Sequence, residues 1–240
     1  MECLRATGVA RAFEGVAALQ GVDLEVRRHE VVGLIGPNGA GKTTLVNCMT
    51  GFDLPDTGRV ALDEREITRW PVRRRARAGL ARTFQHGHLF KGLSVRENVE
   101  VAALGVGRSA RAARHRGSEL LDLLNLRDRA DQEAGLLPHG EEMKLGVARA
   151  LATEPRYVLM DEPAAGLSDS EVPAFADVLR SVRDKHEAGV LVIDHNMGLI
   201  MGVCDRVFVL DEGKLIAHGP PDEVRRNEQV AAAYLGAARG

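Results

Sequence analysis

The chain has 240 residues, of which 45% are hydrophobic and 28% are charged, and its formal net charge is −2. This length is sufficient for one large domain with a substantial core, whereas the near-neutral charge gives no general attraction to nucleic acid, so we expect no nucleic-acid partner. Three widely spaced cysteines indicate reduced thiols in a cytosolic protein, and no apolar stretch approaches the ~18 residues of a membrane-spanning helix.

The first part of the chain is predicted to consist mainly of strands, because short apolar or alternating runs are separated by turn residues. In chain order, strands are expected at residues 4–9, 22–26, 31–35, 59–62 and 79–84. A helix ending near Gly51 follows the third strand. The arginine-rich run at 73–77 is expected to be a solvated face.

The continuous apolar run at 31–35 leads directly into the pattern G-x-x-x-x-G-K-T, which is typical of a phosphate-binding loop. Glycines let the backbone N–H groups turn toward one phosphate, and the start of the next helix adds a positive field. Lys42 would contact the β- and γ-phosphates, and Thr43 would bind Mg²⁺. The predicted nucleotide-binding residues here are Gly36, Pro37, Asn38, Gly39, Ala40, Gly41, Lys42, Thr43 and Thr44. The alternative is a glycine-rich turn that binds no ligand.

The middle of the chain is predicted to be helical, and the α/β pattern then returns. Helices are expected from 94 to about 126, with a break near 105–108, and from 141 to about 153, so residues 86–155 are interpreted as a helical insert. Strands at 157–160, 190–193, 206–210 and 214–218, a helix at 170–187, a short helix after residue 193 and a helical tail at 222–235 complete the prediction.

Two carboxylates, Asp161 and Glu162, directly follow the buried strand at 157–160. A phosphate-binding site needs one carboxylate to hold Mg²⁺, and a second one can polarise the attacking water. An ordinary charged strand end is the alternative interpretation.

With these motifs in place, the whole chain resembles the ATPase subunits of ABC transporters. The run from Arg82 to Gln85 is similar to the Q-loop of that family, and residues 166–168 are similar to its D-loop. His195 matches the switch histidine, and Phe13 matches the aromatic residue that stacks on adenine. The position of the signature loop is taken by Leu137, Pro138, His139, Gly140 and Glu141.

This resemblance implies one ABC ATPase domain over 1–240. Its α/β fold is a P-loop NTPase core with a mostly parallel sheet flanked by helices, an N-terminal antiparallel β-subdomain and the helical subdomain at 86–155. It implies ATP and Mg²⁺ as cofactors, with Thr43, Gln85 and Asp161 at the metal. Glu162 would act as the base, His195 would contact the γ-phosphate, and Lys42 would stabilise developing charge.

The same resemblance implies partners. Two ATPase subunits would sandwich two ATP molecules head to tail, each donating its signature loop to the other's site. The pattern from Ala81 to Gln85 and the tail from Gly213 to Gly236 are most similar to the branched-chain amino acid importers. That branch implies permease subunits, a solute-binding protein and a position on the cytoplasmic face of the inner membrane.

The signature loop departs from the usual Leu-Ser-Gly-Gly-Gln, since Pro138 lacks both a hydroxyl and a backbone N–H. We therefore expect a different ATPase chain as the partner. The alternatives left open are an ATPase for lipid or lipopolysaccharide export, a non-transport ABC protein and a nucleotide-binding regulator without useful hydrolysis.

Overall fold

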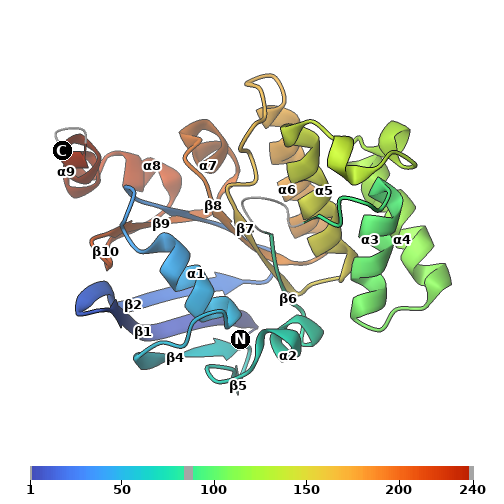
Figure 1. Cartoon of the computed structure of the whole chain (residues 1–240). Helices are drawn as coiled ribbons and strands as arrows, with labels where there is room; N and C mark the ends of the chain where they lie inside the picture. The colour runs from blue at the N-terminus through green and yellow to red at the C-terminus, as the bar shows by residue number, and fades with distance from the viewer. Residues whose placement is uncertain (1, 84–88, 238–240) are drawn as a thin grey trace.

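The computed structural model describes residues 2–83 and 89–237, which fold around two β-sheets (Figure 1). The N-terminal sheet is antiparallel, with strand order β2-β1-β4-β5, and the larger sheet has the order β10-β9-β3-β8-β7-β6. In the larger sheet β9, β3, β8, β7 and β6 run parallel, and β10 pairs antiparallel at one edge. The strands are β1 (Cys3–Phe13), β2 (Val16–Arg27), β3 (Val31–Ile35), β4 (Thr57–Leu62), β5 (Arg65–Glu66), β6 (Leu80–Arg82), β7 (Tyr157–Asp161), β8 (Gly189–Ile193), β9 (Arg206–Asp211) and β10 (Lys214–Gly219).

Helices cover both faces of the larger sheet and form a separate cluster at one end of the molecule. In Figure 1, α1 lies in front of the sheets, whereas α3, α4 and α5 gather beyond β6. The helices are α1 (Lys42–Thr50), α2 (Val72–Arg77), α3 (Val95–Gly105), α4 (Ala110–Leu123), α5 (His139–Ala152), α6 (Val172–Lys185), α7 (Met197–Val203), α8 (Pro221–Arg225) and α9 (Glu228–Ala237), with 3-10 turns at Arg127–Arg129 and Ala134–Leu136.

The burial pattern explains this arrangement. Every residue of β3, β7 and β8 is buried, as expected for parallel strands covered on both faces. One core cluster joins α1 to both sheets through residues such as Leu45 and Met49, and a second cluster joins the helical region to the other face of the larger sheet. The predicted α/β fold class is confirmed.

Most element boundaries agree with the sequence pattern, and the differences have local causes. Ser94 and Glu97 form a reciprocal capping box, so α3 begins where a helix start is expected. The helix expected at 141 begins at His139, because Pro138 supplies the extended residue before it. The tail was expected to form one helix, but it forms two helices, α8 and α9, with Asn227 between them. Neither α2 nor β5 was predicted from the sequence. In the case of α2 the reason is that the helix is short and has no apolar period.

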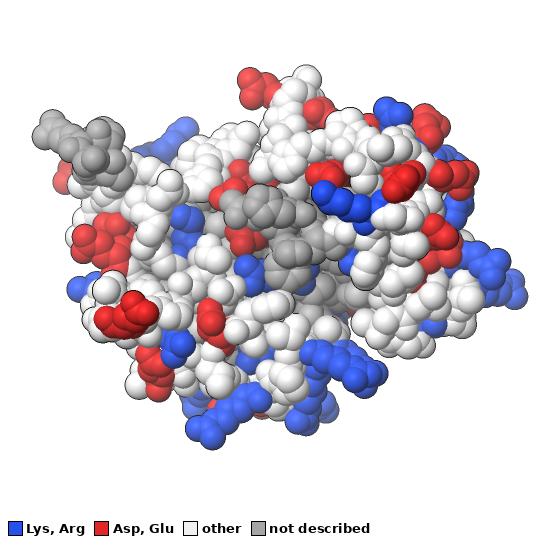
Figure 2. Space-filling model, in the orientation of Figure 1, with Lys and Arg blue, Asp and Glu red and all other residues white. Residues whose placement is uncertain are grey.

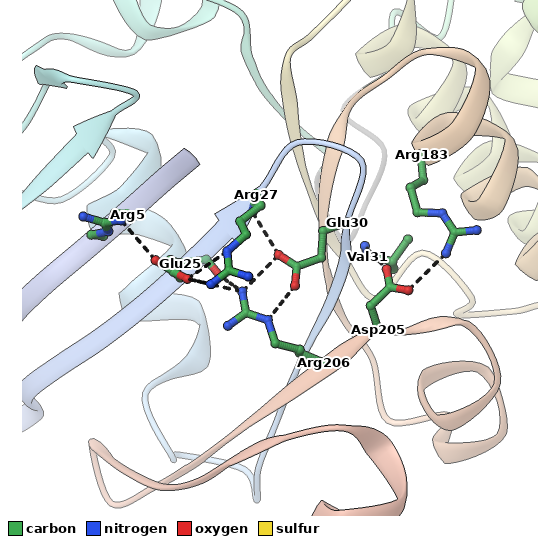
Figure 3. Close-up of polar contacts among 8 residues, drawn as sticks. All are labelled: Arg5, Glu25, Arg27, Glu30, Val31, Arg183, Asp205 and Arg206. Atoms are coloured by element: carbon green, nitrogen blue, oxygen red, sulfur yellow. Dashed lines mark hydrogen bonds and ion pairs between the residues drawn. The ribbon is translucent and has the colours of Figure 1, made fainter. Parts of the chain in front are cut away.

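An ion-pair network fixes the ends of the strands opposite the expected nucleotide site (Figure 3). Arg206 at the start of β9 donates to both carboxylate oxygens of Glu30, at 2.5 and 3.0 Å, and the backbone N–H of Arg27 donates to the same carboxylate at 3.0 Å. Asp205 accepts the Val31 N–H at 2.8 Å. The network therefore ties the end of β2 to the starts of β3 and β9.

The solvated face expected for the arginines at 73–77 is wrong for Arg75. Its side chain is 1% exposed and donates to the carbonyl oxygens of Cys48, Met49, Thr68 and Trp70, at 2.7–2.9 Å. Two of these carbonyls belong to the last turn of α1, where a cation is favourable. Burial lowers the pKa of Arg75 to about 10. The neighbouring arginines are exposed, and Figure 2 shows basic side chains gathered on the lower edge over α2.

We predict that Arg75→Met lowers the free energy of unfolding by about 3 kcal/mol, because four carbonyl oxygens lose a charged donor in a buried position. Chemical denaturation measures this loss. Arg73→Met is the matched control, since Arg73 is exposed, and it should change the stability by no more than about 0.5 kcal/mol. Equal effects of the two substitutions would contradict the role given to Arg75.

Candidate nucleotide-binding site

The carboxyl ends of β3, β8 and β7 bring most of the predicted nucleotide-binding residues to one edge of the sheet. These three strands are neighbours, and Ile193 pairs with both Leu34 and Asp161. Ligands of open parallel sheets bind at this edge. A cavity of 220 Å³ lies there, lined by Ala18, Asn38, Gly39, Ala40, Gly41, Lys42, Thr43, Thr44, Asp161, Glu162, Ile193 and His195.

The loop between β3 and α1 needs glycine where its backbone passes close to other chain segments. An added Cβ would lie 2.0 Å from the Leu210 carbonyl oxygen at Gly36 and 2.4 Å from the Ala18 carbonyl oxygen at Gly41. Gly41 also has a φ of 98°, which disfavours L side chains, and it is the residue before the first turn of α1. The loop is therefore held between β2 and β9, and its path depends on both sheets.

Lys42 is buried and already hydrogen-bonded within its own loop. Its Nζ donates to the carbonyl oxygens of Gly36 at 2.7 Å and Pro37 at 2.8 Å. Burial lowers the pKa of Lys42, and the nearby carboxylates of Glu162 and Asp161 oppose this shift. The carbonyl oxygens of the loop thus hold the side chain over the loop, at the edge of the cavity.

Glu162 and His195 face each other across the cavity. Glu162 has a φ of 48°, and its backbone N–H donates to the Ile193 carbonyl at 2.7 Å, so the turn after β7 lies against the end of β8. Its Oε1 is 3.1 Å from Nε2 of His195. A carboxylate that is positioned by an imidazole at the edge of a phosphate site suits a general base.

Asp161 lies deeper and is paired with Arg82, the last residue of β6. Arg82 Nη2 donates to Asp161 Oδ2 at 3.1 Å, and the two side chains are 8% and 9% exposed. Arg82 Nη1 donates to Asn47 Oδ1 of α1 at 2.6 Å. The Thr83 hydroxyl accepts the Asp161 N–H at 3.2 Å. Arg82 therefore contacts the Asp161 carboxylate directly and links it to α1, and Thr83 contacts the backbone of the same residue.

The donor set fits a nucleotide-bound Mg²⁺. Thr43 and Asp161 line the same cavity and offer hydroxyl and carboxylate oxygens, which this ion prefers. Within the described residues, no group of three His, Cys, Asp or Glu side chains could hold a metal by itself.

Asp194, for which the sequence predicts no role, connects two turns beside the cavity. Its carboxylate accepts the N–H groups of Asn196 at 2.8 Å and Ala164 at 3.0 Å. Burial raises its pKa, and the backbone donors oppose the shift. Asp194 therefore links the turn that carries His195 to the loop after Glu162.

The predicted signature loop lies outside this cavity. Leu137 is buried, whereas Pro138 and His139 are exposed at the start of α5. The Pro138 carbonyl accepts the Glu142 N–H at 2.9 Å, but no side chain caps the helix. The loop packs on the predicted D-loop, since a Cβ added at Gly166 would lie 2.5 Å from the His139 ring.

A salt bridge extends this contact between the two loops. Lys144 of α5 donates to Glu171 at 2.9 Å, and Glu171 accepts both the N–H and the hydroxyl of Ser168. These hydrogen bonds, led by that from Lys144, lower the pKa of Glu171 to about 2. The predicted signature loop and D-loop thus form one surface.

One predicted residue, Phe13, does not line the cavity, and another cannot be placed. Phe13, at the end of β1, is not among the lining residues; its ring is 42% exposed, and the Arg11 guanidinium lies 4.7 Å from the ring centroid. Gln85 lies outside the described residues. Arg82, Asn47 and Asp194 are the contributors that sequence reasoning missed, because their roles depend on contacts between elements far apart in the chain.

The comparisons with known proteins identify the family. A family model described as ABC transporter matches residues 19–165, which is more than half of the chain. The chain is 39% identical to the high-affinity branched-chain amino acid transport ATP-binding protein LivG of Salmonella typhimurium, over 98% of both chains. The chain therefore belongs to the ABC transporter family and is an ATPase of that class.

Within the family, the similarity is strongest to one branch among the relatives compared. A second model, described as branched-chain amino acid ATP-binding cassette transporter, matches residues 214–239. The chain is 38% identical to BraF of Pseudomonas aeruginosa, a branched-chain amino acid transport ATP-binding protein, and 36% identical to the lipopolysaccharide export ATP-binding protein LptB of Escherichia coli, in each case over 98% of both chains.

Solved structures agree with the assignment to the ABC transporter family. The ADP conformation of MJ1267, an ATP-binding cassette of an ABC transporter, has a TM-score of 0.87 and 29% identity, covering 98% of this chain and 99% of that one. A nucleotide-free ATP-binding cassette gives a TM-score of 0.86 with 28% identity, over the same shares. No helix within the described ranges is both long and apolar enough to span a membrane.

We predict that Gly41→Ala destabilises the chain by about 2 kcal/mol more than Gly39→Ala does. Both glycines have positive φ, but a Cβ at Gly39 meets nothing within 4 Å, whereas at Gly41 it meets the Ala18 carbonyl. Thermal unfolding of the nucleotide-free variants measures the difference. Equal stabilities would show that the backbone conformation alone, and not the close packing on β2, requires glycine at 41.

Proposed function

We propose that the chain binds Mg²⁺–ATP in the cavity at the ends of β3, β7 and β8 and hydrolyses it to power a transporter. The observation that carries this proposal is the convergence of Lys42, Asp161, Glu162 and His195 on one 220 Å³ cavity. The Lys42 ammonium gives up its hydrogen bonds to the loop carbonyl oxygens and donates instead to oxygens of the β- and γ-phosphates. Phe13 stacks on the adenine, and Gln85 reaches the nucleotide from the Q-loop.

We assign the chemical step to Glu162. Its carboxylate orients the attacking water and accepts a proton from it, while His195, 3.1 Å away, holds the carboxylate and contacts the γ-phosphate. Thr43 and Asp161 supply the protein oxygens for Mg²⁺, whose charge would stabilise the phosphate oxygens.

The cavity of one chain is incomplete as a closed ATP site, because its own signature loop does not line it. We propose that a second ATPase subunit donates this loop and receives the loop of this chain in return. The exposed Pro138 and His139 lack the hydroxyl of the usual signature serine, which favours a different chain as the partner.

A second cavity supports docking of a permease subunit. It has a volume of 270 Å³ and lies between α2, β6, α3 and α5, with apolar residues such as Val72, Phe52 and Ala102 along its walls. Two arginines, Arg82 and Arg149, also line it. A permease helix seated here would hold the chain on the cytoplasmic face of the inner membrane.

We propose branched-chain amino acids, or similar small solutes delivered by a solute-binding protein, as the cargo. The similarity to LivG and BraF and the match over residues 214–239 favour this assignment. Lipopolysaccharide or lipid export is the second candidate, supported by the similarity to LptB. The cargo does not contact this subunit, so the identity of permeases that co-purify with it distinguishes the two.

We predict that Glu162→Gln retains ATP binding but lowers the hydrolysis rate by about a hundredfold or more, since the proton acceptor is lost. Lys42→Ala should instead weaken binding itself, because the buried ammonium that reaches the phosphates is removed. Fluorescent-nucleotide titration and phosphate release measure the two effects. An equal loss of affinity in both variants would refute the assignment of roles.

We predict that Glu162→Gln with ATP remains a monomer or self-associates only weakly, because the loop containing Pro138 provides a poor phosphate contact. Light scattering measures the mass. Glu162→Gln combined with Lys42→Ala is the control that does not hold ATP. A stable ATP-dependent homodimer would show that the chain needs no different partner.

A further inference from the structure

Arg82 lies at the junction of three nucleotide-site elements, although its sequence motif assigns it no role. Its guanidinium donates to Asp161 at the end of β7, to Asn47 Oδ1 at 2.6 Å and to Thr50 Oγ1 at 3.4 Å on α1. The side chain is only 8% exposed. It also lines the 270 Å³ cavity, together with Thr83.

This ion pair involves the carboxylate that the proposed function assigns to Mg²⁺. A buried carboxylate needs a compensating charge, and in the described structure Arg82 provides it. Burial lowers the pKa of Arg82, and the pairing with Asp161 opposes that shift. The contacts to Asn47 and Thr50 prevent the guanidinium from simply following Asp161 if the carboxylate moves.

We propose that Arg82 is a positioning residue that acts through Asp161 and sets how strongly nucleotide binding depends on Mg²⁺. The proposal rests on the proposed function, because it requires Asp161 to be the carboxylate near the metal. Arg82 holds the carboxylate at the base of the cavity and neutralises it before the cation is present.

The electrostatics give the direction of the effect. Without Arg82, the unpaired Asp161 repels the phosphates of metal-free ATP, so binding in EDTA weakens. When Mg²⁺ accompanies ATP, its charge compensates the same carboxylate, so binding is maintained or strengthened. A unit charge a few ångströms away in a partly buried site changes such affinities by about tenfold or more. The ratio of the affinity with Mg²⁺ to the affinity in EDTA should therefore rise by about tenfold in Arg82→Gln.

The experiment is titration of a fluorescent ATP analogue with and without Mg²⁺, performed in the Glu162→Gln background so that turnover does not intervene. Electron paramagnetic resonance of Mn²⁺, used in place of Mg²⁺, measures metal retention by the protein–nucleotide complex independently of activity. Arg82→Gln should hold Mn²⁺ more tightly than the parent.

Asn47→Ala is the matched control, since it removes the shorter of the two contacts of Arg82 on α1 but leaves the charge beside Asp161. It should leave the affinity ratio within about twofold of the parent, and a tenfold rise would overturn the proposal by showing that Arg82 only holds α1. Arg82→Lys keeps the charge with a shorter reach, so its ratio should lie between the parent and Arg82→Gln. Should Arg82→Gln not fold, Arg82→Met, which also removes the charge, takes its place, and a ratio equal to the parent's then overturns the proposal.

The outcomes separate this inference from the proposed function. If the parent binds the analogue equally with Mg²⁺ and in EDTA, the metal role given to Asp161 is wrong. If the parent depends on Mg²⁺ and Arg82→Gln shows the same ratio and the same Mn²⁺ affinity, the role given to Arg82 alone is wrong.

Discussion

The close approach of the phosphate loop to two neighbouring strands is the constraint on which the site depends. Gly36 passes against the Leu210 carbonyl of β9, and Gly41 passes against the Ala18 carbonyl of β2. No side chain fits at either contact, so the loop takes its shape from the N-terminal sheet and from the larger sheet together. The ion-pair network at the other end of β2, β3 and β9 holds these strands in the same relative position (Figure 3).

Parallel pairing then determines which side chains meet. Because β3, β8 and β7 are adjacent, the segments after them lie at one edge and bring Lys42, His195 and Glu162 within one cavity. The signature loop, in contrast, starts α5 and packs on the loop before α6. One fold thus presents a nucleotide cavity and a separate surface of motif residues, which is the arrangement expected for subunits that complete each other's sites.

The sequence was sufficient to predict the fold class and the helix start at Ser94, because local pattern and capping residues determine them. The sequence also indicated that Lys42 and Asp161 lie close together, because the phosphate-binding motif and the carboxylates each follow a buried strand, and such strands end at the same edge of a parallel sheet. Arg75 and Arg82 could not be predicted, since both look like ordinary surface arginines and their burial depends on carbonyl or carboxylate groups from distant segments. The division of the tail at Asn227 was missed for a different reason, because both halves have helical composition.

The two hydrogen bonds of Lys42 to its own loop have a kinetic consequence. The ammonium is buried and already oriented by these bonds, so a phosphate bound there as proposed would replace two carbonyl acceptors and would not have to order a mobile side chain. Little ordering is left for the ligand to impose at this point. Nucleotides that differ in affinity should therefore differ mainly in their dissociation rates, whereas their association rates should be similar.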